Sequence, residues 1–383
     1  MSNLRKFVSP EFVFGANALG MTGQYARNFG ARKALVVSDR GVCSSGWTRN
    51  VCSALETAGI KYERFTDVSP NPRAEEVMQG GEIYENRDCD VIIAVGGGSA
   101  IDCAKGIGIS SSNKKHILEF EGVDNVDIPG PPLICIPTTA GSSADVSQFA
   151  IITNREERVK IAIISKANVP DVALIDPVTT TTMDGYLTAC TGMDALVHGI
   201  EAFVSAASSP IFDLHALEAV RLINSYLVAA IDNPGDSVAR EKMMLGSLEA
   251  GLAFSNASLG AVHAMAHSLG GFLDLPHGEC NSMLLDHVIA YNYEADPRRY
   301  ERIGRAMGIE TDRLAGQERK AALLKKIRQL KKEAGITRTL KDIGLAKSDI
   351  PLLSRKALQD ACIFTNPRRP HQRDIEVIYE EAL

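Results

Sequence analysis

Short, almost unbroken runs of Val, Ile and Leu recur through the first half of the chain, and segments of helical periodicity separate most of them. Strands that are apolar on both faces are typical of a parallel sheet covered by helices on both sides. We therefore predict an N-terminal α/β domain. The predicted strands are residues 34–38, 62–65, 91–95, 133–137 and 172–175.

Two further β-type runs, residues 149–153 and 159–164, flank a polar NREER turn, and we expect an antiparallel hairpin added to that sheet. After Asp176 the pattern changes to long amphipathic segments, for example residues 211–231 and 237–253, with no convincing strand. The prediction is a two-domain chain, with an α/β domain at residues 1–185 and an all-α domain at residues 186–383.

The composition restricts the class of protein. Of 383 residues, 45% are apolar and 23% charged, and the net charge of −6 argues against a nucleic-acid partner. The N-terminus lacks an apolar leader and we expect no membrane span, hence no membrane partner. Eight scattered cysteines without a CxxC pair indicate reduced thiols in a cytoplasmic protein.

The segment VIIAVGGGSAIDCAKGIG (residues 91–108) reads as a strand, a glycine turn and a helix. Gly96, Gly97 and Gly98 would let the backbone approach a phosphate at the positive end of the new helix. We predict a Rossmann-like domain that binds the pyrophosphate of a dinucleotide; the alternative is a tight turn without a ligand. Asp102 joins the candidate cofactor residues, although with Lys105, one turn later, it would also suit a surface ion pair.

Asp39 ends the predicted strand ALVVSD. An acidic residue there can bind the ribose 2′-hydroxyl of NAD and repel the 2′-phosphate of NADP. A helix N-cap is the alternative reading. The loop PTTAGSS (residues 137–143) follows another strand. Its hydroxyl groups that would hold the nicotinamide ribose or the pyrophosphate belong to Thr138, Thr139, Ser142 and Ser143.

Three of the eight histidines fall within fifteen residues. His263 and His267 are four apart in an apolar helical pattern, whereas His277 follows a Gly-Gly pair and a proline and is expected in a loop. Asp194 and His198 form a second pair four apart. A tetrahedral divalent site needs three or four such donors, and spacing alone does not say which of the five is spare. Hydrogen-bonded core histidines and a helix N-cap at Asp194 are the alternatives.

Seven motifs are spread over essentially the whole chain: SPNPR (69–73), GGGSAIDCAK (96–105), IPTTAGSSADV (136–146), TGMDALVHGIEAF (191–203), NASLGAVHAMAHSLGG (256–271), LPHGECN (275–281) and TNPR (365–368). With these motifs the chain resembles the iron-dependent, or group III, alcohol dehydrogenases. It is most similar to the branch of lactaldehyde reductase, propanediol dehydrogenase and ethanol dehydrogenase. This resemblance implies a dehydroquinate synthase-like architecture.

The resemblance also implies a set of functional residues. His267 would lie beside the nicotinamide as the catalytic proton relay. The metal, Fe²⁺ first and Zn²⁺ or Mn²⁺ as alternatives, would be held by Asp194, His198, His263 and His277. NAD(H) would lie along the glycine loop, near Asp39, Asn71, Gly97, Ser99, Thr138, Thr139, Lys160 and His267. The substrate pocket would include Ile151, Phe254 and Cys362.

The implied activity is the metal-dependent, NAD(H)-linked interconversion of a short-chain primary alcohol or diol and its aldehyde by hydride transfer, in a homodimer or higher homo-oligomer. Three arginines behind Cys362 (Arg368, Arg369 and Arg373) suggest an anionic aldehyde such as sulfoacetaldehyde as an alternative substrate. A glycerol-type polyol is another.

The sequence departs from the family in two places. The family's loop TTAGTGSE is TTAGSSAD here, and Ile151 replaces an asparagine of some lactaldehyde reductases.

Overall fold

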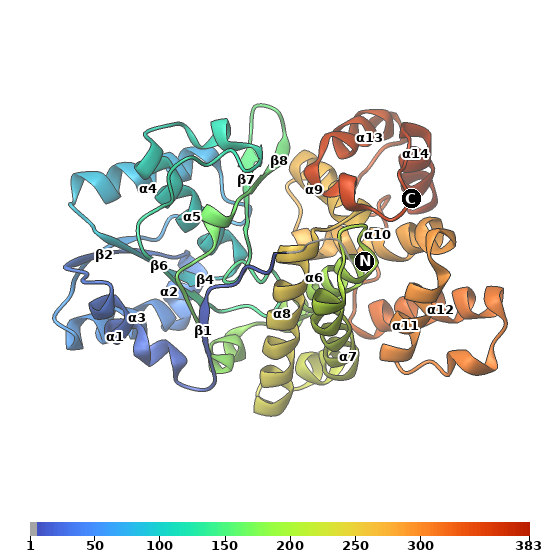
Figure 1. Cartoon of the computed structure of the whole chain (residues 1–383), viewed down its shortest axis with the longest axis horizontal. Helices are drawn as coiled ribbons and strands as arrows, with labels where there is room; N and C mark the ends of the chain where they lie inside the picture. Colours follow the sequence, from blue (N-terminus) through green and yellow to red (C-terminus); the bar gives the residue numbers. More distant parts are fainter. Residues whose placement is uncertain (1–5) are drawn as a thin grey trace. The chain divides into compact units, whose positions relative to one another are not determined.

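The computed structural model describes residues 6–383 and divides into two compact units (Figure 1). The first unit is Val8–Thr182. The second contains Met183–Leu383 together with residues 6 and 7. The break falls after residue 182, whereas the sequence pattern placed it after residue 185.

A six-stranded sheet with the order β1-β9-β6-β4-β2-β3 forms the centre of the first unit, and every described strand pair in it is parallel. The sequence pattern predicted five of these strands and missed the short edge strand β1 as a member of the sheet. The strands are β1 (Glu11–Phe14), β2 (Lys33–Val37), β3 (Lys61–Phe65), β4 (Val91–Gly96), β6 (Leu133–Pro137) and β9 (Val172–Ile175).

Helices cover both faces of this sheet, which explains the unbroken apolar runs. Leu35 and Val37 of β2 contribute to one buried cluster with residues of α4 and α5. Ala34 and Val36, which alternate with them, contribute to a second cluster with residues of α3. The helices of this unit are α1 (Thr22–Asn28), α2 (Arg40–Ser45), α3 (Trp47–Thr57), α4 (Ala74–Asn86) and α5 (Gly98–Asn113).

The predicted hairpin exists, but it does not join the parallel sheet. β7 (Phe149–Asn154) and β8 (Val159–Ile164) pair antiparallel and form a separate three-stranded sheet with β5 (Gly122–Val123). Ile152 and Ile161 belong to the same buried cluster as residues of α4 and α5. The hairpin therefore packs on these helices, and the edges of the main sheet are taken by β1 and β3.

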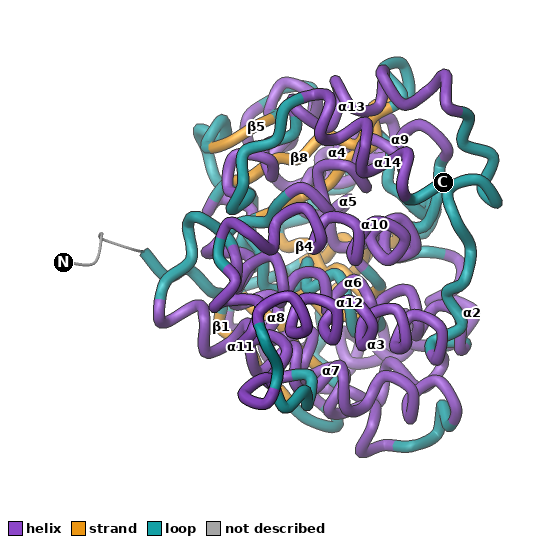
Figure 2. Tube along the Cα trace, turned by 90° about the vertical axis from the view of Figure 1, so that its right-hand side faces the viewer, coloured by secondary structure: helices purple, strands orange, loops and turns teal. Residues whose placement is uncertain are grey.

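The described residues of the second unit form helices and no strand (purple in Figure 2). α6 packs against α7, α8 and α10, which accounts for its burial on all sides. The α-helices are α6 (Gly185–Val204), α7 (Pro210–Asp232), α8 (Ser237–Ala257), α9 (Ala261–Leu273), α10 (His277–Asn292), α11 (Pro297–Ala306), α12 (Gly316–Glu333), α13 (Ile350–Gln359) and α14 (Gln372–Glu381). Among residues 6–383, the 3-10 helices are η1 (Ala18–Met21), η2 (Ile117–Phe120), η3 (Lys166–Asn168), η4 (Pro177–Thr182), η5 (Tyr293–Ala295), η6 (Thr311–Arg313), η7 (Lys347–Asp349) and η8 (Ala361–Thr365).

One helix of this unit, α7, is long and apolar enough to cross a membrane by length and composition alone. The same helix packs against α6, α8 and α11 and contains the buried Asp213, which is ion-paired with Arg299. These contacts are typical of a core helix.

Candidate active site

Three of the predicted metal donors converge from three helices. Asp194 lies on α6, His263 on α9 and His277 on α10, and their donor atoms lie within 4.8 Å of one another. The Oδ1 atom of Asp194 is 3.8 Å from the Nε2 atoms of both His263 and His277. Two ligands of a tetrahedral ion lie roughly 3.4 Å apart when each bond is about 2.1 Å. One carboxylate and two imidazoles at this spacing therefore fit a divalent metal with little adjustment.

The sequence pattern misplaced His277. It is the first residue of α10 rather than part of a loop, because Gly270 and Gly271 continue α9 to Leu273. Asp274, with φ of 53°, ends α9 in the left-handed region, and α10 begins after Pro276. The helix start thus fixes the backbone that carries His277.

A residue that the sequence reasoning did not select, Asn281, links the three donors. Its Nδ2 atom is 2.6 Å from Asp194 Oδ1 and 3.2 Å from Nε2 of both His263 and His277. Asn281 is fully buried and follows His277 by four residues, so both side chains lie on one face of α10. That spacing was the only signal in the sequence.

His198, the fourth predicted ligand, stacks on the cluster. Its ring centroid is 4.6 Å from that of His263 and 4.2 Å from that of Phe254, a residue predicted for the substrate pocket. Within the described chain, the donor group that lies inside 4.8 Å contains Asp194, His263 and His277 but no nitrogen of His198. Its role as a metal ligand stays a prediction.

His263 is held on its other side by Glu201 of α6, which the sequence reasoning also missed. The Nδ1 atom of His263 lies 2.7 Å from Glu201 Oε2. Burial lowers the pKa of His263 to about 3, which leaves a neutral imidazole, the form that binds metals. Burial raises the pKa of Glu201 to about 7, against backbone N–H donors that favour the carboxylate.

His267 belongs to a second group, with Asp360 and Cys362. Its Nδ1 atom is 2.7 Å from Asp360 Oδ2, and the other oxygen of Asp360 accepts a hydrogen bond of 2.8 Å from the backbone N–H of Cys362. Burial alone would raise the pKa of Asp360, but the His267 imidazole and the Cys362 N–H hold it below its ordinary value. Burial and the nearby Asp360 raise the pKa of the Cys362 thiol, which therefore stays protonated.

In the first unit, the two predicted cofactor loops lie side by side at the carboxyl ends of β4 and β6. The backbone N–H of Thr138 donates to the carbonyl of Gly96 at 2.9 Å. A Cβ atom on Gly98 would lie 2.8 Å from Ser142 Oγ, and one on Gly97 would lie 3.1 Å from Thr139 Cγ2. The close approach of residues 137–143 therefore requires glycine at positions 97 and 98, whether or not a phosphate also binds there.

Asp39 caps a helix, as the alternative reading of the sequence expects, and its contact with the ribose stays a prediction. It is the N-cap of α2, where its side chain accepts a hydrogen bond of 3.0 Å from the N–H of Val42. Its other oxygen, Oδ2, would lie 3.3 Å from a Cβ atom on Gly96. One oxygen therefore caps the helix while the other lies beside the glycine loop.

Three further predicted cofactor residues are connected to one another. The Nζ atom of Lys160 donates to Asn71 Oδ1 at 2.6 Å, and the N–H of Asn71 donates to Ser99 Oγ at 3.3 Å. Asp102 and Lys105 are both buried, so the alternative of a surface ion pair is wrong for them. Instead, the buried Nζ atom of Lys105 donates hydrogen bonds to the main-chain carbonyls of Ser147, at 2.8 Å, and Phe149, at 2.7 Å.

Two of the three arginines that suggested an anionic substrate, Arg368 and Arg373, have other partners. The guanidinium of Arg368 lies 4.0 Å from the ring centroid of Tyr291 and donates to its carbonyl. Arg373 pairs with Glu376 and Glu380 of its own helix, α14. Both arginines are exposed.

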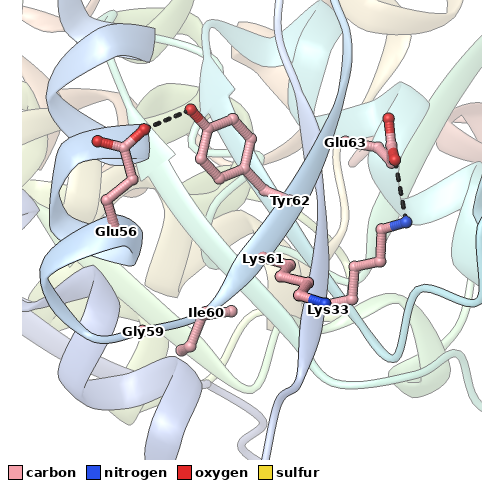
Figure 3. A pocket seen from close by; sticks show the side chains of 7 residues that line it. All are labelled: Lys33, Glu56, Gly59, Ile60, Lys61, Tyr62 and Glu63. Carbon is pink, nitrogen blue, oxygen red and sulfur yellow. Dashed lines mark hydrogen bonds and ion pairs between the residues drawn. The ribbon is translucent and has the colours of Figure 1, made fainter.

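An open surface pocket of about 480 Å³ lies elsewhere, at the start of β2 and β3 (Figure 3). Tyr62 donates to Glu56 and Lys33 pairs with Glu63 at its rim. Because β2, β3 and β4 are parallel, this pocket lies at the amino ends of the strands, whereas the glycine loop lies at their carboxyl ends. It is separate from the predicted cofactor site.

A glycine loop on a parallel α/β unit and a buried carboxylate–imidazole cluster on a helical unit define a dinucleotide- and metal-dependent oxidoreductase. The chain belongs to the iron-containing alcohol dehydrogenase family. Residues 9–177 match the model "Iron-containing alcohol dehydrogenase", and residues 188–383 match "Fe-containing alcohol dehydrogenase family, C-terminal".

Individual relatives agree with this membership. The chain is 38% identical to 1,3-propanediol dehydrogenase of Citrobacter freundii over 371 residues, 96% of each chain. A crystal structure of 1,3-propanediol oxidoreductase superimposes with a TM-score of 0.96 at 37% identity and covers all of both chains. The NAD⁺ complex of sulfoacetaldehyde reductase from Bifidobacterium kashiwanohense superimposes with a TM-score of 0.87 at 30% identity, over 100% of this chain and 99% of that one.

The fold class, the family, the enzyme class and the cofactors expected from the sequence, NAD(H) and a divalent metal, are thereby confirmed. The protein is an alcohol dehydrogenase. The roles of individual residues stay predictions that the geometry supports.

Proposed function

We propose that the enzyme interconverts a short, uncharged primary alcohol or diol and its aldehyde, with NAD(H) as the hydride carrier. The observation that carries this proposal is the buried cluster of Asp194, His263 and His277, whose donor atoms converge within 4.8 Å. Asp194, His198, His263 and His277 would hold the metal. When bound, the divalent ion would act as a Lewis acid toward the substrate oxygen, and NAD(H) would exchange the hydride.

The side chains beside the cluster support a neutral substrate. Phe254 is buried and stacks on His198, and Cys362 is fully buried with a protonated thiol. Arg368 and Arg373 are engaged with Tyr291 and with α14 carboxylates. An apolar lining formed by Phe254 and Cys362 would exclude water and favour short aliphatic groups over a sulfonate or carboxylate.

His267 would move the proton. Because the Nδ1 atom of His267 is hydrogen-bonded to the Asp360 carboxylate, the Nε2 atom is the one that can accept or release a proton. The buried Asp360 carboxylate fixes this tautomer and would stabilise a transient imidazolium, as a carboxylate does beside a general-base histidine.

Substrate screening tests the proposal. Metal-free enzyme would be reconstituted with Fe²⁺, Zn²⁺ or Mn²⁺ and assayed for NADH oxidation with propanal, 3-hydroxypropanal, glyceraldehyde and sulfoacetaldehyde. We expect turnover of the first two and little with sulfoacetaldehyde. Preference for the anionic aldehyde would overturn the neutral-substrate assignment, and the absence of turnover with every aldehyde in fully metallated enzyme would overturn the activity.

We further propose a homodimer or higher homo-oligomer in the cytoplasm. β1 is an edge strand of the sheet and exposes Phe12, so it offers an unpaired strand edge to a second copy. All eight cysteines are free, which suits a reducing compartment. Sedimentation equilibrium would contradict the assembly by giving a single species of 41.3 kDa at every concentration.

A further inference from the structure

Glu201 contacts both the start of α9 and the first histidine of that helix. It lies on α6, is 4% exposed, and follows Asp194 by seven residues, two helical turns. Its Oε1 accepts a hydrogen bond of 2.7 Å from the N–H of Val262, and its Oε2 accepts one of 3.0 Å from the N–H of Gly260. The same Oε2 lies 2.7 Å from His263 Nδ1.

The N-terminus of α9 depends on this distant carboxylate because it has no local cap. The N-cap residue is Gly260, which has no side chain to accept a hydrogen bond. A second distant group, the Oδ1 atom of Asn366, accepts from the N–H of Ala261 at 3.1 Å. A buried carboxylate at this position is also favoured by the positive end of the helix dipole.

The contact with His263 determines which ring nitrogen can bind a metal. With both Glu201 oxygens accepting, Nδ1 of His263 carries the hydrogen and Nε2 carries the lone pair. That Nε2 is the atom 3.8 Å from Asp194 Oδ1. A ligating imidazole whose other nitrogen donates to a carboxylate is oriented and made more basic, and loss of such a partner typically costs 10- to 100-fold in metal affinity.

We propose that Glu201 is a positioning residue of the metal centre, which fixes the tautomer of His263 and the start of α9 with one carboxylate. This inference rests on the ligand set proposed above. It predicts that part of the metal-binding free energy depends on a residue that does not touch the metal.

The chain supplies two matched controls. Asp360 makes the same 2.7 Å contact with Nδ1 of His267, one turn further along α9, but His267 lies outside the Asp194 donor group in the described structure. Asn366 caps the same helix start without an observed hydrogen bond to His263 in the described residues. Asp360→Asn therefore removes an equivalent carboxylate, and Asn366→Ala removes only a cap.

The test measures Zn²⁺ affinity by competition with a chromophoric chelator, and the His263 tautomer by ¹⁵N NMR of the metal-free, histidine-labelled protein. We expect Glu201→Gln to weaken Zn²⁺ binding 10- to 100-fold and to move the hydrogen of His263 toward Nε2. Asp360→Asn and Asn366→Ala should bind Zn²⁺ within about threefold of the parent protein, although Asn366→Ala should melt at a lower temperature.

Parental Zn²⁺ affinity and an unchanged His263 tautomer in Glu201→Gln, with only a lower melting temperature, would reduce Glu201 to a helix cap and overturn the proposal. If Glu201→Gln does not fold, Glu201→Asp, which keeps the charge but shortens the reach, takes its place and should show the same losses to a smaller degree. His263→Ala distinguishes an error in the metal-ligand set from an error in the role of Glu201. Retention of parental affinity in His263→Ala would show that the ligand set itself is wrong, whatever Glu201 does.

Discussion

The imidazole of His267 stacks on that of His277, with ring centroids 5.1 Å apart and ring planes inclined by 15°. The two rings nevertheless belong to different groups. The Nε2 atom of His277 lies 3.8 Å from Asp194, whereas Nδ1 of His267 is hydrogen-bonded to Asp360. Proximity therefore does not make His267 a metal donor, although helical spacing with His263 alone would suggest it.

This division predicts opposite effects of two alanine substitutions. His277→Ala should lose a metal donor and weaken metal binding by at least about 100-fold, with loss of activity. His267→Ala should retain a full equivalent of metal and lose roughly 100-fold in kcat, because only the proton relay is removed. Elemental analysis after gel filtration, combined with steady-state kinetics, checks both. A full metal equivalent in His277→Ala, or loss of metal in His267→Ala, would reverse the assignment.

We predict that Asp39 sets the preference for NAD in addition to capping α2, so the substitution must separate these two roles. Asp39→Ser keeps a side-chain oxygen for the N–H of Val42 but removes the carboxylate beside the glycine loop. We expect the ratio of kcat/KM for NADP to that for NAD to rise roughly tenfold, because the 2′-phosphate is no longer repelled.

Thermal unfolding supplies the control for this variant. Asp39→Ser should stay within about 0.5 kcal/mol of the parent protein, whereas Asp39→Ala, which removes the cap, should lose about 1 kcal/mol. An unchanged NADP ratio in Asp39→Ser would leave the carboxylate as a helix cap and no more.

The four inner strands of the main sheet, β2, β4, β6 and β9, were predicted because both of their faces are buried, which gives each of them an almost unbroken apolar run. Two donors of the metal cluster, Asp194 and His263, were also visible, because each occurs four residues from a histidine on the same helix. Periodicity on one helix is a local property, and a single sequence records it directly.

The carboxylates that hydrogen-bond to His263 and His267 could not be predicted, because they are distant in the sequence. Glu201 is 62 residues from His263, and Asp360 is 93 residues from His267, so only the packing of whole helices brings each pair together. The hairpin was placed in the wrong sheet for a related reason: its strand pattern is local, but its burial against α5 is a tertiary contact. Local patterns do not specify such contacts.

The departure from the family loop at Ser143 has a consequence for stability. Ser143 is buried and has φ of 50°, in the left-handed region that favours glycine, and the related family motif has glycine at this position. Its hydroxyl donates a long hydrogen bond of 3.3 Å to the carbonyl of Gly141. Ser143→Gly should raise the free energy of unfolding by about 1 kcal/mol.

Urea unfolding checks this, with the adjacent Ser142→Gly as the control. Ser142 has no positive φ, so glycine there should lower stability by roughly 0.5–1 kcal/mol. Equal losses in both variants would show that the Ser143 hydroxyl outweighs the backbone strain.

Another replaced position of that loop, Asp145, predicts a pH dependence of stability. Asp145 is buried, and burial raises the pKa of its carboxyl to about 6, although its own backbone N–H and the nearby Lys105 favour the charged form. Between about pH 4 and pH 6 the folded protein therefore holds this proton more tightly than the unfolded chain does. The contribution of Asp145 to stability falls as pH rises through this window and is constant above it.

Asp145→Asn removes the titration with little change of shape. Its unfolding free energy relative to the parent protein should rise by about 1–3 kcal/mol between pH 4 and pH 6 and then level off. Urea titrations at half-unit steps of pH measure this difference, and Asp127→Asn, which removes an exposed carboxylate, should show no comparable step. A difference that does not vary with pH, or an Asp145→Asn protein that is less stable at pH 8, would show that attraction to Lys105 outweighs the cost of burying the charge.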